Sequence, residues 1–186
     1  MKKSCILQVL LFILTAGSAF GVVADDHSGP YFGVQYAMTE EDNIDLEPTA
    51  AVIRVGNLTD QGFGYEFRIG TGIQSDDRSE NLTFLGETSL ELEIDYLVGL
   101  YLLAEAQMGA GSIYGIIGYS QITYTLDVDS EFLSCCDSDT EDESGWSYGF
   151  GANFDVSDKV GLNIEFMQYL DTDDVEASAI SVGVLF

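Results

Sequence analysis

The chain has 186 residues, of which 32 are acidic and only six are Lys or Arg, so its formal net charge is −26. A protein that binds nucleic acid needs Lys and Arg to neutralise phosphates, and this composition excludes that class. The length suffices for one domain with a sizeable apolar surface.

The first 24 residues are expected to be a cleaved signal peptide. Residues 1–3 supply a short positive region, and residues 6–16 form an apolar run that is too short to span a membrane as a helix. Small residues then allow cleavage after Gly21 or after Ala24, and we prefer Ala24 because two aspartates then begin the mature chain. The prediction is a signal peptide at 1–24 and one domain at 25–186.

From residue 30 onwards apolar and polar side chains alternate, which is typical of β-strands with two different faces. The expected strands, in chain order, are Pro30–Thr39, Thr49–Gly56, Gly62–Ile73, Leu90–Val98, Ser112–Leu126, Trp146–Phe154, Val160–Met167 and Ser178–Phe186. Long acidic loops are expected at 40–48, 74–87, 127–145 and 170–176, and shorter turns at 57–61, 102–111 and 156–159. Long loops that alternate with short turns are what an outer-membrane barrel requires.

The strand Ser112–Leu126 is the one whose two faces the sequence leaves open. Ile122 and Leu126 share a face near its end, whereas Ile113 and Tyr114, upstream, fall on opposite parities although both are apolar or aromatic. A β-bulge that switches the parity within this strand would account for the pattern.

The last nine residues, 178–186, alternate regularly and end on Phe186 without a polar tail. A soluble protein rarely ends on an apolar strand, because the edge of that strand would be sticky. A closed barrel removes the difficulty, since its last strand pairs with its first.

Alternation alone does not say which face meets lipid, because a soluble lipocalin-like barrel also alternates, with its apolar face inward. Here the polar faces combine glycines with opposed charges, which suits a narrow interior, and aromatic residues such as Phe63, Trp146 and Phe154 lie near strand ends, as in interfacial girdles. We therefore predict an all-β fold, an eight-stranded antiparallel transmembrane β-barrel with up-and-down meander topology. Both termini are expected in the periplasm and the acidic loops at the cell surface.

A charge network is expected inside this barrel, because buried carboxylates need partners or protons. Folding the second strand on the third about residue 60 places Arg54 opposite Glu66, and folding the third on the fourth brings Arg68 near Glu91 and Glu93. The predicted interior residues are Arg54, Glu66, Arg68, Glu91, Glu93, Asp95 and Glu165. We interpret them as a stabilising plug, since an eight-stranded barrel has room only for side chains; the alternative is a path for protons or cations.

The longest acidic loop carries two further candidate sites. Cys135 and Cys136 could form a local disulfide, link two chains or stay free, and we rank the local disulfide first and the intermolecular link second. A disulfide between adjacent residues is strained, because their Cα atoms are only about 3.8 Å apart. The loop could also bind Ca²⁺ or Mg²⁺ weakly, although it lacks the complete order of an EF-hand. The candidate residues are Asp127, Asp129, Asp137, Asp139, Glu141, Asp142 and Glu143.

Catalytic residues are not predicted. The single histidine, His27, lies before the first strand, and barrel enzymes that transfer or remove acyl chains rely on a His base beside a Ser nucleophile. Apart from weakly bound Ca²⁺ or Mg²⁺, no cofactor is expected.

Four segments together resemble a known family: PYFGVQYAMT, GFGYEFRIGTG, WSYGFGANFDVSDKVGLNIEFMQY and the terminal SAISVGVLF. They are similar to the small outer-membrane β-barrel proteins of the OmpA/OmpX-like and opacity-protein (porin-family) type of Gram-negative bacteria. The resemblance implies a monomer in outer-membrane lipid and lipopolysaccharide, escorted by periplasmic chaperones. It also implies that the last strand, with Val182, Val184 and Phe186, is the signal that the barrel-assembly machinery reads.

The family's roles vary among envelope integrity, adhesion and host interaction, which leaves three functional hypotheses. The first is a non-enzymatic surface protein that presents acidic loops to cations, lipopolysaccharide or host partners. The second is a narrow cation-preferring channel, motivated by the acidic residues of the fourth strand. The third and least favoured is a lipid-modifying barrel enzyme.

Overall fold

The computed structural model describes residues 28–41, 47–82, 86–130, 137–171 and 176–186. These residues form the strands β1 (Gly29–Glu41), β2 (Thr49–Leu58), β3 (Phe63–Gln74), β4 (Asp76–Leu82), β5 (Gly86–Gln107), β6 (Gly111–Ser130), β7 (Asp137–Ser157), β8 (Val160–Asp171) and β9 (Glu176–Leu185). No helix among the described residues is long and apolar enough to cross a membrane. The predicted signal peptide lies outside the described part of the chain.

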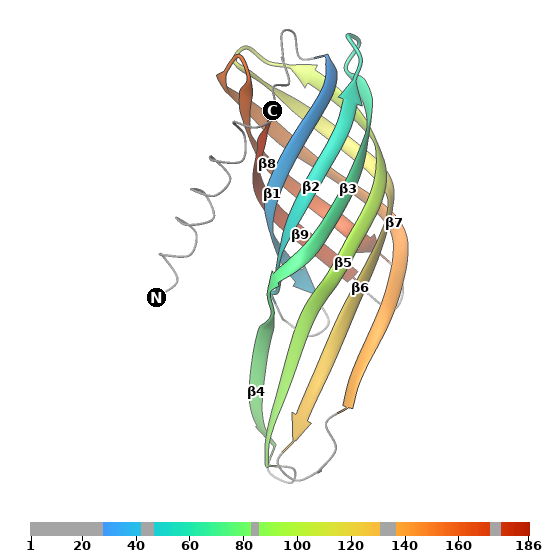
Figure 1. Ribbon diagram of the computed structural model, residues 1–186, viewed down its shortest axis with the longest axis vertical. Coiled ribbons are helices and arrows are strands. Elements are labelled where there is room, and N and C mark those ends of the chain that lie inside the picture. The colour runs from blue at the N-terminus through green and yellow to red at the C-terminus, as the bar shows by residue number, and fades with distance from the viewer. Residues whose placement is uncertain (1–27, 42–46, 83–85, 131–136, 172–175) are drawn as a thin grey trace.

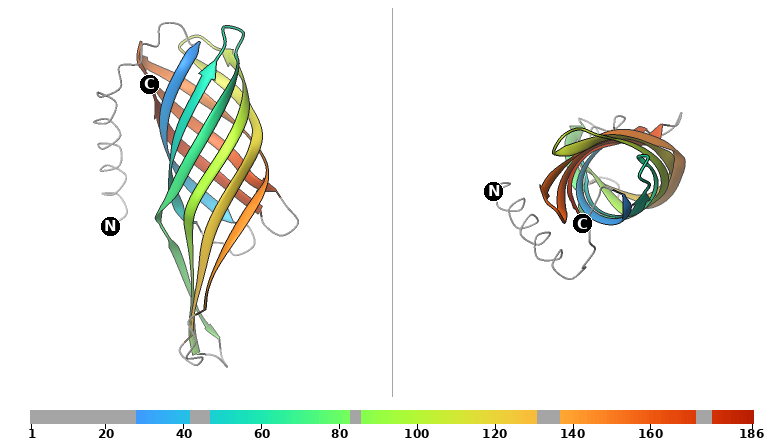
Figure 2. Two further views of the ribbon diagram at one scale, coloured as in Figure 1. Left: turned by 45° about the vertical axis from the view of Figure 1, so that its right-hand side comes forward. Right: turned by 90° about the horizontal axis from the view of Figure 1, so that it is seen from above.

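The strands close into an antiparallel barrel, which Figure 2 shows from the side and from one end. Strands β3 and β4 follow one another along the same side of β5, so that together they occupy one of eight positions around the barrel. The cycle closes where β1 pairs with β9, from Gly33 opposite Leu185 to Glu41 opposite Ala177. The predicted eight-stranded up-and-down meander is confirmed.

The two ends of the barrel differ. One end, at the top of Figure 1, holds the start of β1, the C-terminus and the tight turns at 59–62, 108–110 and 158–159; we call it the turn end. The opposite end, which we call the loop end, carries the longer connections. At the loop end β4 and the adjoining parts of β5, β6 and β7 project well beyond the other strands (Figure 1).

The outer wall is an apolar belt. On β3, for example, Phe63 and Phe67 are exposed to the outside, whereas Glu66 and Arg68 between and beside them are buried in the interior. A surface this apolar would be unfavourable in water and suits a lipid bilayer. The predicted assignment of the apolar face to lipid and the polar face to the interior therefore agrees with the structure.

Two of the predicted loops are largely β-sheet. Strand β4 and the first two residues of β5 fall within the predicted loop 74–87. Strands β6 and β7 stay paired as far as Val128 opposite Asp137, inside the predicted loop 127–145. We call this projecting four-stranded sheet the extension. The sequence conceals it because acidic residues fall on both parities there, so that neither face has the alternation of a half-buried strand.

The predicted bulge exists, but in the neighbouring strand. Ile94 lies opposite Tyr124 and Tyr96 lies opposite Thr123, so Asp95 of β5 has no residue directly opposite it in β6. Strand β6 keeps its alternate residues from Ser112 to Ile122 toward the interior, so the predicted switch of parity within that strand is wrong. The bulge instead reverses the parity of β5.

The reversal corrects the placement of three predicted interior residues. Before the bulge, Leu92 and Ile94 face inward, so Glu91 and Glu93 point outward and are exposed, as is Asp95 itself. After the bulge, odd-numbered residues such as Tyr101 face inward. The strand also continues to Gln107, which shortens the predicted turn 102–111 to residues 108–110.

The barrel closes with aromatic and backbone contacts at its last residue. The Phe186 ring stacks on Phe32 with centroids 6.4 Å apart, Phe32 N donates to Phe186 O at 3.1 Å, and Phe186 N donates to Phe32 O at 2.8 Å. The inward residues of β9 are small: Ala179, Ser181 and Gly183 are buried.

Deleting Phe186 is therefore expected to destabilise the closure by about 2–4 kcal/mol, the sum of two hydrogen bonds and one aromatic contact. The measurement is the fraction of protein that migrates as a folded, heat-modifiable band after refolding into lipid vesicles. A Phe186→Tyr variant keeps the ring and the backbone groups and should behave like the original chain; a full yield of folded protein after the deletion would contradict the expectation.

Candidate functional site

Four charged side chains meet in the interior, and we call them the ion cluster: Arg54 on β2, Glu66 and Arg68 on β3, and Glu165 on β8. Each is at most 1% exposed. Alternation directs all four inward, and the closure of the barrel brings β8 to the opposite wall from β2 and β3. These four of the seven predicted interior residues are the ones that the structure brings together.

The ion pairs within the ion cluster are short, and two of them are made by two hydrogen bonds each. Arg68 Nη1 and Nη2 donate to the two carboxylate oxygens of Glu165, each at 2.6 Å, and Arg68 Nε donates to Glu66 Oε1 at 2.5 Å. Arg54 donates to Glu66 Oε2 from Nε at 2.9 Å and from Nη2 at 2.7 Å. Two guanidinium groups thus balance two carboxylates, and forked contacts of this kind are strong and directional.

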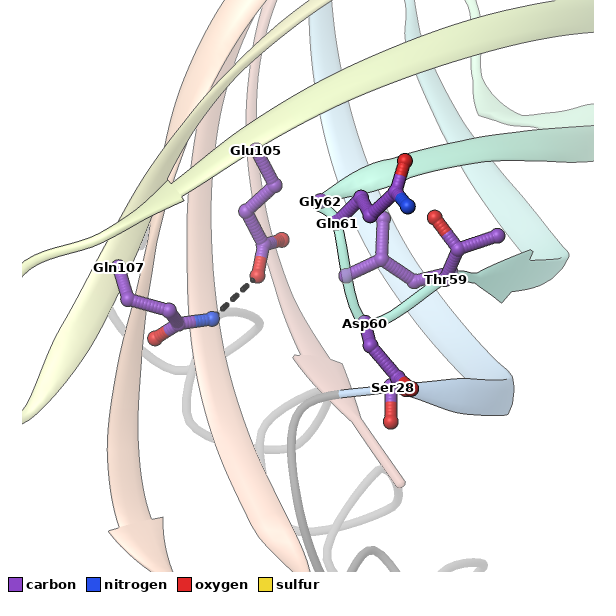
Figure 3. A pocket seen from close by; sticks show the side chains of 8 residues that line it. Ser28, Thr59, Asp60, Gln61, Gly62, Glu105 and Gln107 are labelled. Carbon is purple, nitrogen blue, oxygen red and sulfur yellow. Dashed lines mark hydrogen bonds between the residues drawn. The ribbon is translucent and has the colours of Figure 1, made fainter.

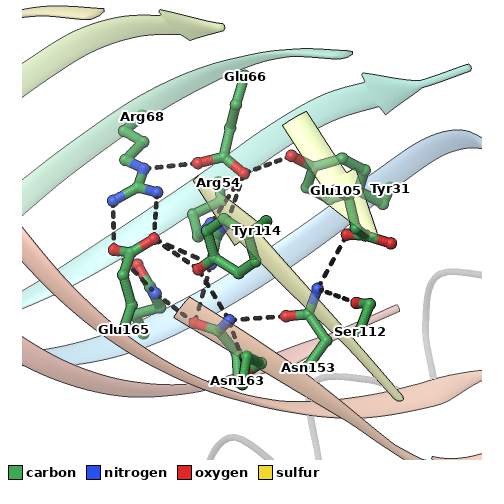
Figure 4. A network of polar contacts seen from close by, with 12 residues as sticks. Tyr31, Arg54, Glu66, Arg68, Glu105, Ser112, Tyr114, Asn153, Asn163 and Glu165 are labelled. Carbon is green, nitrogen blue, oxygen red and sulfur yellow. Dashed lines mark hydrogen bonds and ion pairs between the residues drawn. The ribbon is translucent and has the colours of Figure 1, made fainter. Parts of the chain in front are cut away.

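Neutral side chains complete the cluster, as Figure 4 shows. Tyr31 donates to Glu66 Oε2, and Tyr114 donates to Glu165 Oε2 at 2.6 Å. Asn163 Oδ1 accepts from Arg54 Nη1 at 2.9 Å and from Gln35 Nε2 at 2.6 Å. Each lies at an inward position on its strand, yet none carries a charge, and so the sequence reasoning, which looked for opposed charges, missed these residues.

The register differs from the predicted one. Arg54 lies opposite Arg68, and Glu66 lies opposite Gly56, so the turn between β2 and β3 is centred one residue later than expected. The predicted pairing of Arg54 with Glu66 still forms, because the guanidinium reaches diagonally to the neighbouring inward position. The predicted contact of Arg68 with Glu91 and Glu93 is wrong: Arg68 lies opposite Gly99 and reaches across the barrel to Glu165.

Apolar side chains fill the interior between the ion cluster and the loop end. The buried apolar residues there are Ala37, Ala50, Val52, Ile94, Leu97, Ile122, Met167, Leu170 and Ala179, with Tyr169 among them. With Glu91, Glu93 and Asp95 on the outside, the acidic interior face that motivated the channel hypothesis is absent from the described strands. The ion cluster pairs two guanidinium groups with two carboxylates, and its role as a stabilising plug stays a prediction.

The interior opens toward the turn end, and a smaller apolar cavity of about 40 Å³ lies near the loop end, with Leu92, Ile94 and Tyr169 in its lining. A cavity of about 580 Å³ has Tyr31, Arg54, Ser112 and Asn153 in its lining, and an adjoining one of about 440 Å³, shown in Figure 3, lies beside the turn 59–62. Glu105 lines both cavities and accepts from Gln107 Nε2 at 2.8 Å and from Asn153 Nδ2 at 3.1 Å. Among the described residues, the linings of these two cavities include no histidine.

The acidic residues proposed as a cation site lie on two paired strands rather than in a loop. Thr123 and Tyr96 donate to Asp142, the latter at 3.5 Å, and Tyr124 donates to Glu141 at 3.1 Å. Successive residues of a strand point to opposite faces, which separates Asp142 from its neighbours Glu141 and Glu143.

Within the described residues, no three acidic, His or Cys side chains are grouped so that they could hold a metal ion. Asp127 and Asp139 lie on the same two strands, while the side chains of Asp129 and Asp137 fall outside the description, as do Cys135 and Cys136. The disulfide and the weak Ca²⁺ or Mg²⁺ site stay predictions.

Comparison with known proteins identifies the family of this chain. The model of the outer membrane protein beta-barrel domain matches residues 8–186. The chain belongs to this family. The resemblance stated from the sequence is thereby confirmed, and no curated protein is detectably similar in sequence.

Solved structures of outer-membrane proteins share the fold. Ail, the attachment invasion locus protein of Yersinia pestis, is 16% identical over 86% of this chain and 99% of its own, with a TM-score of 0.55. Neisserial surface protein A (NspA) is 14% identical over 85% and 96%, with a TM-score of 0.55. The N-terminal barrel domain of Pseudomonas aeruginosa OprF is 9% identical over 86% and 100%, also with a TM-score of 0.55.

Proposed function

We propose that the protein is a non-enzymatic outer-membrane surface protein whose extension contacts partners outside the cell. The observation that supports this proposal is the unpaired edge of β7. Pairing of β7 with β6 runs to Asp137, but pairing with β8 begins only at Tyr148, so residues 137–146 have no paired strand on one side among the described strands. An exposed strand edge offers backbone donors and acceptors to another chain.

The charge of the extension narrows the kind of partner. Arg78 is its one basic residue in the described part, since Arg54 and Arg68 are buried in the ion cluster and Lys159 lies at the turn end. The Ail structure was also determined with the heparin analogue sucrose octasulfate, a polyanion. An acidic sheet repels polyanions, so the partners proposed for this protein are cationic or neutral.

We place the loop end at the cell surface and both termini in the periplasm, because outer-membrane barrels carry short turns on the periplasmic side. We propose that the chain is a monomer in outer-membrane lipid and lipopolysaccharide and is inserted by the barrel-assembly machinery. The test is labelling of intact cells with an impermeant maleimide, with Cys135 and Cys136 replaced by serine. Thr140→Cys should be labelled and Asp60→Cys, at the turn end, should not; the reverse pattern would invert the topology.

Shortening the extension tests the function itself. Tyr124 and Glu141 lie opposite one another, so residues 125–140 can be replaced by an Asn-Gly turn that joins the two strands. The barrel should keep its heat-modifiable folded form, because the belt and the ion cluster are untouched. Adhesion of expressing cells to host cells or matrix should fall, because the outermost part of the free edge of β7 is removed. Undiminished adhesion by the shortened, folded variant would overturn the proposal.

A further inference from the structure

The outer faces of β5, β6 and β7 carry a distinct polar and aromatic surface at the loop end of the belt. Tyr119 lies opposite Trp146, and one row further toward the extension Gln121 lies opposite Ser144. The next row joins Tyr96, Thr123 and Asp142 across all three strands. The apolar Leu100 lies in the same row as Tyr119, and Phe150 lies further toward the turn end. The surface therefore stands directly above the lipid-facing wall.

Three aromatic rings of this surface are strongly exposed. Trp146, the chain's single tryptophan, is 68% exposed, Tyr119 is 49% exposed and Tyr96 is 41% exposed. Tyr119 and Trp146 pack edge to face with centroids 6.1 Å apart, and the Tyr119 hydroxyl lies 3.1 Å from Ser144 Oγ. Interfacial girdles use such residues, because one part of the ring is apolar and the other end is polar.

Two carboxylates beside the rings are held by hydroxyl groups. Asp142 accepts from Thr123 and from the Tyr96 hydroxyl, and Asp95, at the bulge, accepts from Thr125 Oγ1 at 2.8 Å. A carboxylate offers about four lone-pair directions, so each can accept further hydrogen bonds from a ligand's hydroxyl groups. Flat rings beside fixed acceptors suit a sugar, which has an apolar C–H face and a rim of hydroxyl donors.

The same surface is unsuited to phosphate or sulfate. Its residues include no Lys or Arg, and Arg54 and Arg68 of the barrel interior are buried with their carboxylate partners. Phosphate recognition depends on such cations.

We propose that this aromatic–carboxylate face, made of Tyr96, Tyr119, Asp142, Ser144 and Trp146, binds neutral sugars of the outer-leaflet glycolipid. Its position against the lipid-facing wall favours a sugar that is anchored in the same membrane over a free one. The inference rests on the proposed orientation of the loop end. It goes beyond the proposed function because it assigns the flank of the barrel, and not the free edge of β7, to a ligand.

Trp146 supplies the measurement, since its fluorescence reports from the site without interference from another tryptophan. Purified, detergent-folded protein is titrated with a phosphate-free oligosaccharide released from lipopolysaccharide. A saturable change in Trp146 emission that EDTA does not alter is expected. Sucrose octasulfate, the polyanionic control, should cause none.

Substitutions locate the response. Asp142→Ala should weaken the oligosaccharide affinity at least tenfold, whereas Asp60→Ala, an exposed acid removed at the turn end, should leave it unchanged; both variants are first shown to be heat-modifiable. The proposal is overturned by an unchanged emission, by equal affinity in Asp142→Ala, or by a response that is lost with EDTA. The titration uses purified protein and does not depend on the orientation of the barrel in the membrane. An inverted labelling pattern on cells would therefore contradict the proposed function without changing the result of the titration.

Discussion

Replacing Arg68 by alanine is expected to lower the free energy of unfolding by about 3–5 kcal/mol, the usual cost of breaking a buried ion pair. The loss is large because Glu165 would keep a buried charge without its forked partner, and Glu66 would keep Arg54 as its single cationic partner among the described residues. Equilibrium unfolding in urea, with the protein in lipid vesicles and followed by Trp146 fluorescence, measures the change.

Two matched variants separate charge from packing. The double variant Arg68→Met with Glu165→Gln removes one charge of each sign and should recover most of the stability lost in Arg68→Ala. Glu93→Gln should change stability by less than about 0.5 kcal/mol, because Glu93 is exposed on the extension. A double variant as unstable as Arg68→Ala would show that packing, and not the unpaired charge, dominates.

Replacing Gly118 by valine is expected to cost about 1–3 kcal/mol through overpacking. A Cβ atom at Gly118 would lie 2.2 Å from the Leu100 backbone oxygen and 2.5 Å from Tyr101 Cδ1. The Tyr101 ring cannot withdraw freely, because the Arg68 guanidinium lies 4.8 Å from its centroid. The strain therefore reaches the ion cluster, and urea unfolding should show a lower midpoint.

Gly115, three residues earlier on the same strand, is the control. It faces outward, and a Cβ atom there would have no neighbour within 4 Å. Gly115→Val should therefore be neutral or slightly stabilising, since it adds lipid-facing surface and restricts the unfolded chain. Equal effects at the two glycines would mean that β-propensity, rather than interior space, decides the outcome.

Alternation predicted most of the barrel, because each membrane strand has a lipid face and an interior face that differ in polarity. The inward positions of Arg54, Glu66, Arg68 and Glu165 followed from parity alone. Their partners across the barrel did not, since the contact between Arg68 and Glu165 joins strands that meet only after the barrel has closed. Counting residues outward from a turn predicts which residues lie opposite one another in two consecutive strands, but it predicts no contact between strands that are far apart in the sequence.

The bulge at Asp95 marks where parity reasoning failed. One unpaired residue reversed the faces of β5, and Glu91 and Glu93 went from the predicted interior to the outer face. No residue type at this position signals a bulge. The strands of the extension were missed for a different reason. Apolar and acidic residues such as Leu126 and Asp139 lie opposite one another there, so neither strand shows a regular alternation. The sequence pattern of such an acidic strand in water is close to that of a loop.

The seam between β1 and β9 has a consequence for the order of folding. Every other ladder among the described strands joins segments that are near in sequence, whereas the seam joins Gly33 to Leu185. Closing a loop of that length costs chain entropy before its contacts are gained, so local hairpins such as β5–β6 are expected to form early and the seam last. Until that step, β1 and β9 are both open edges, and the barrel is exposed to mispairing for as long as closure is delayed.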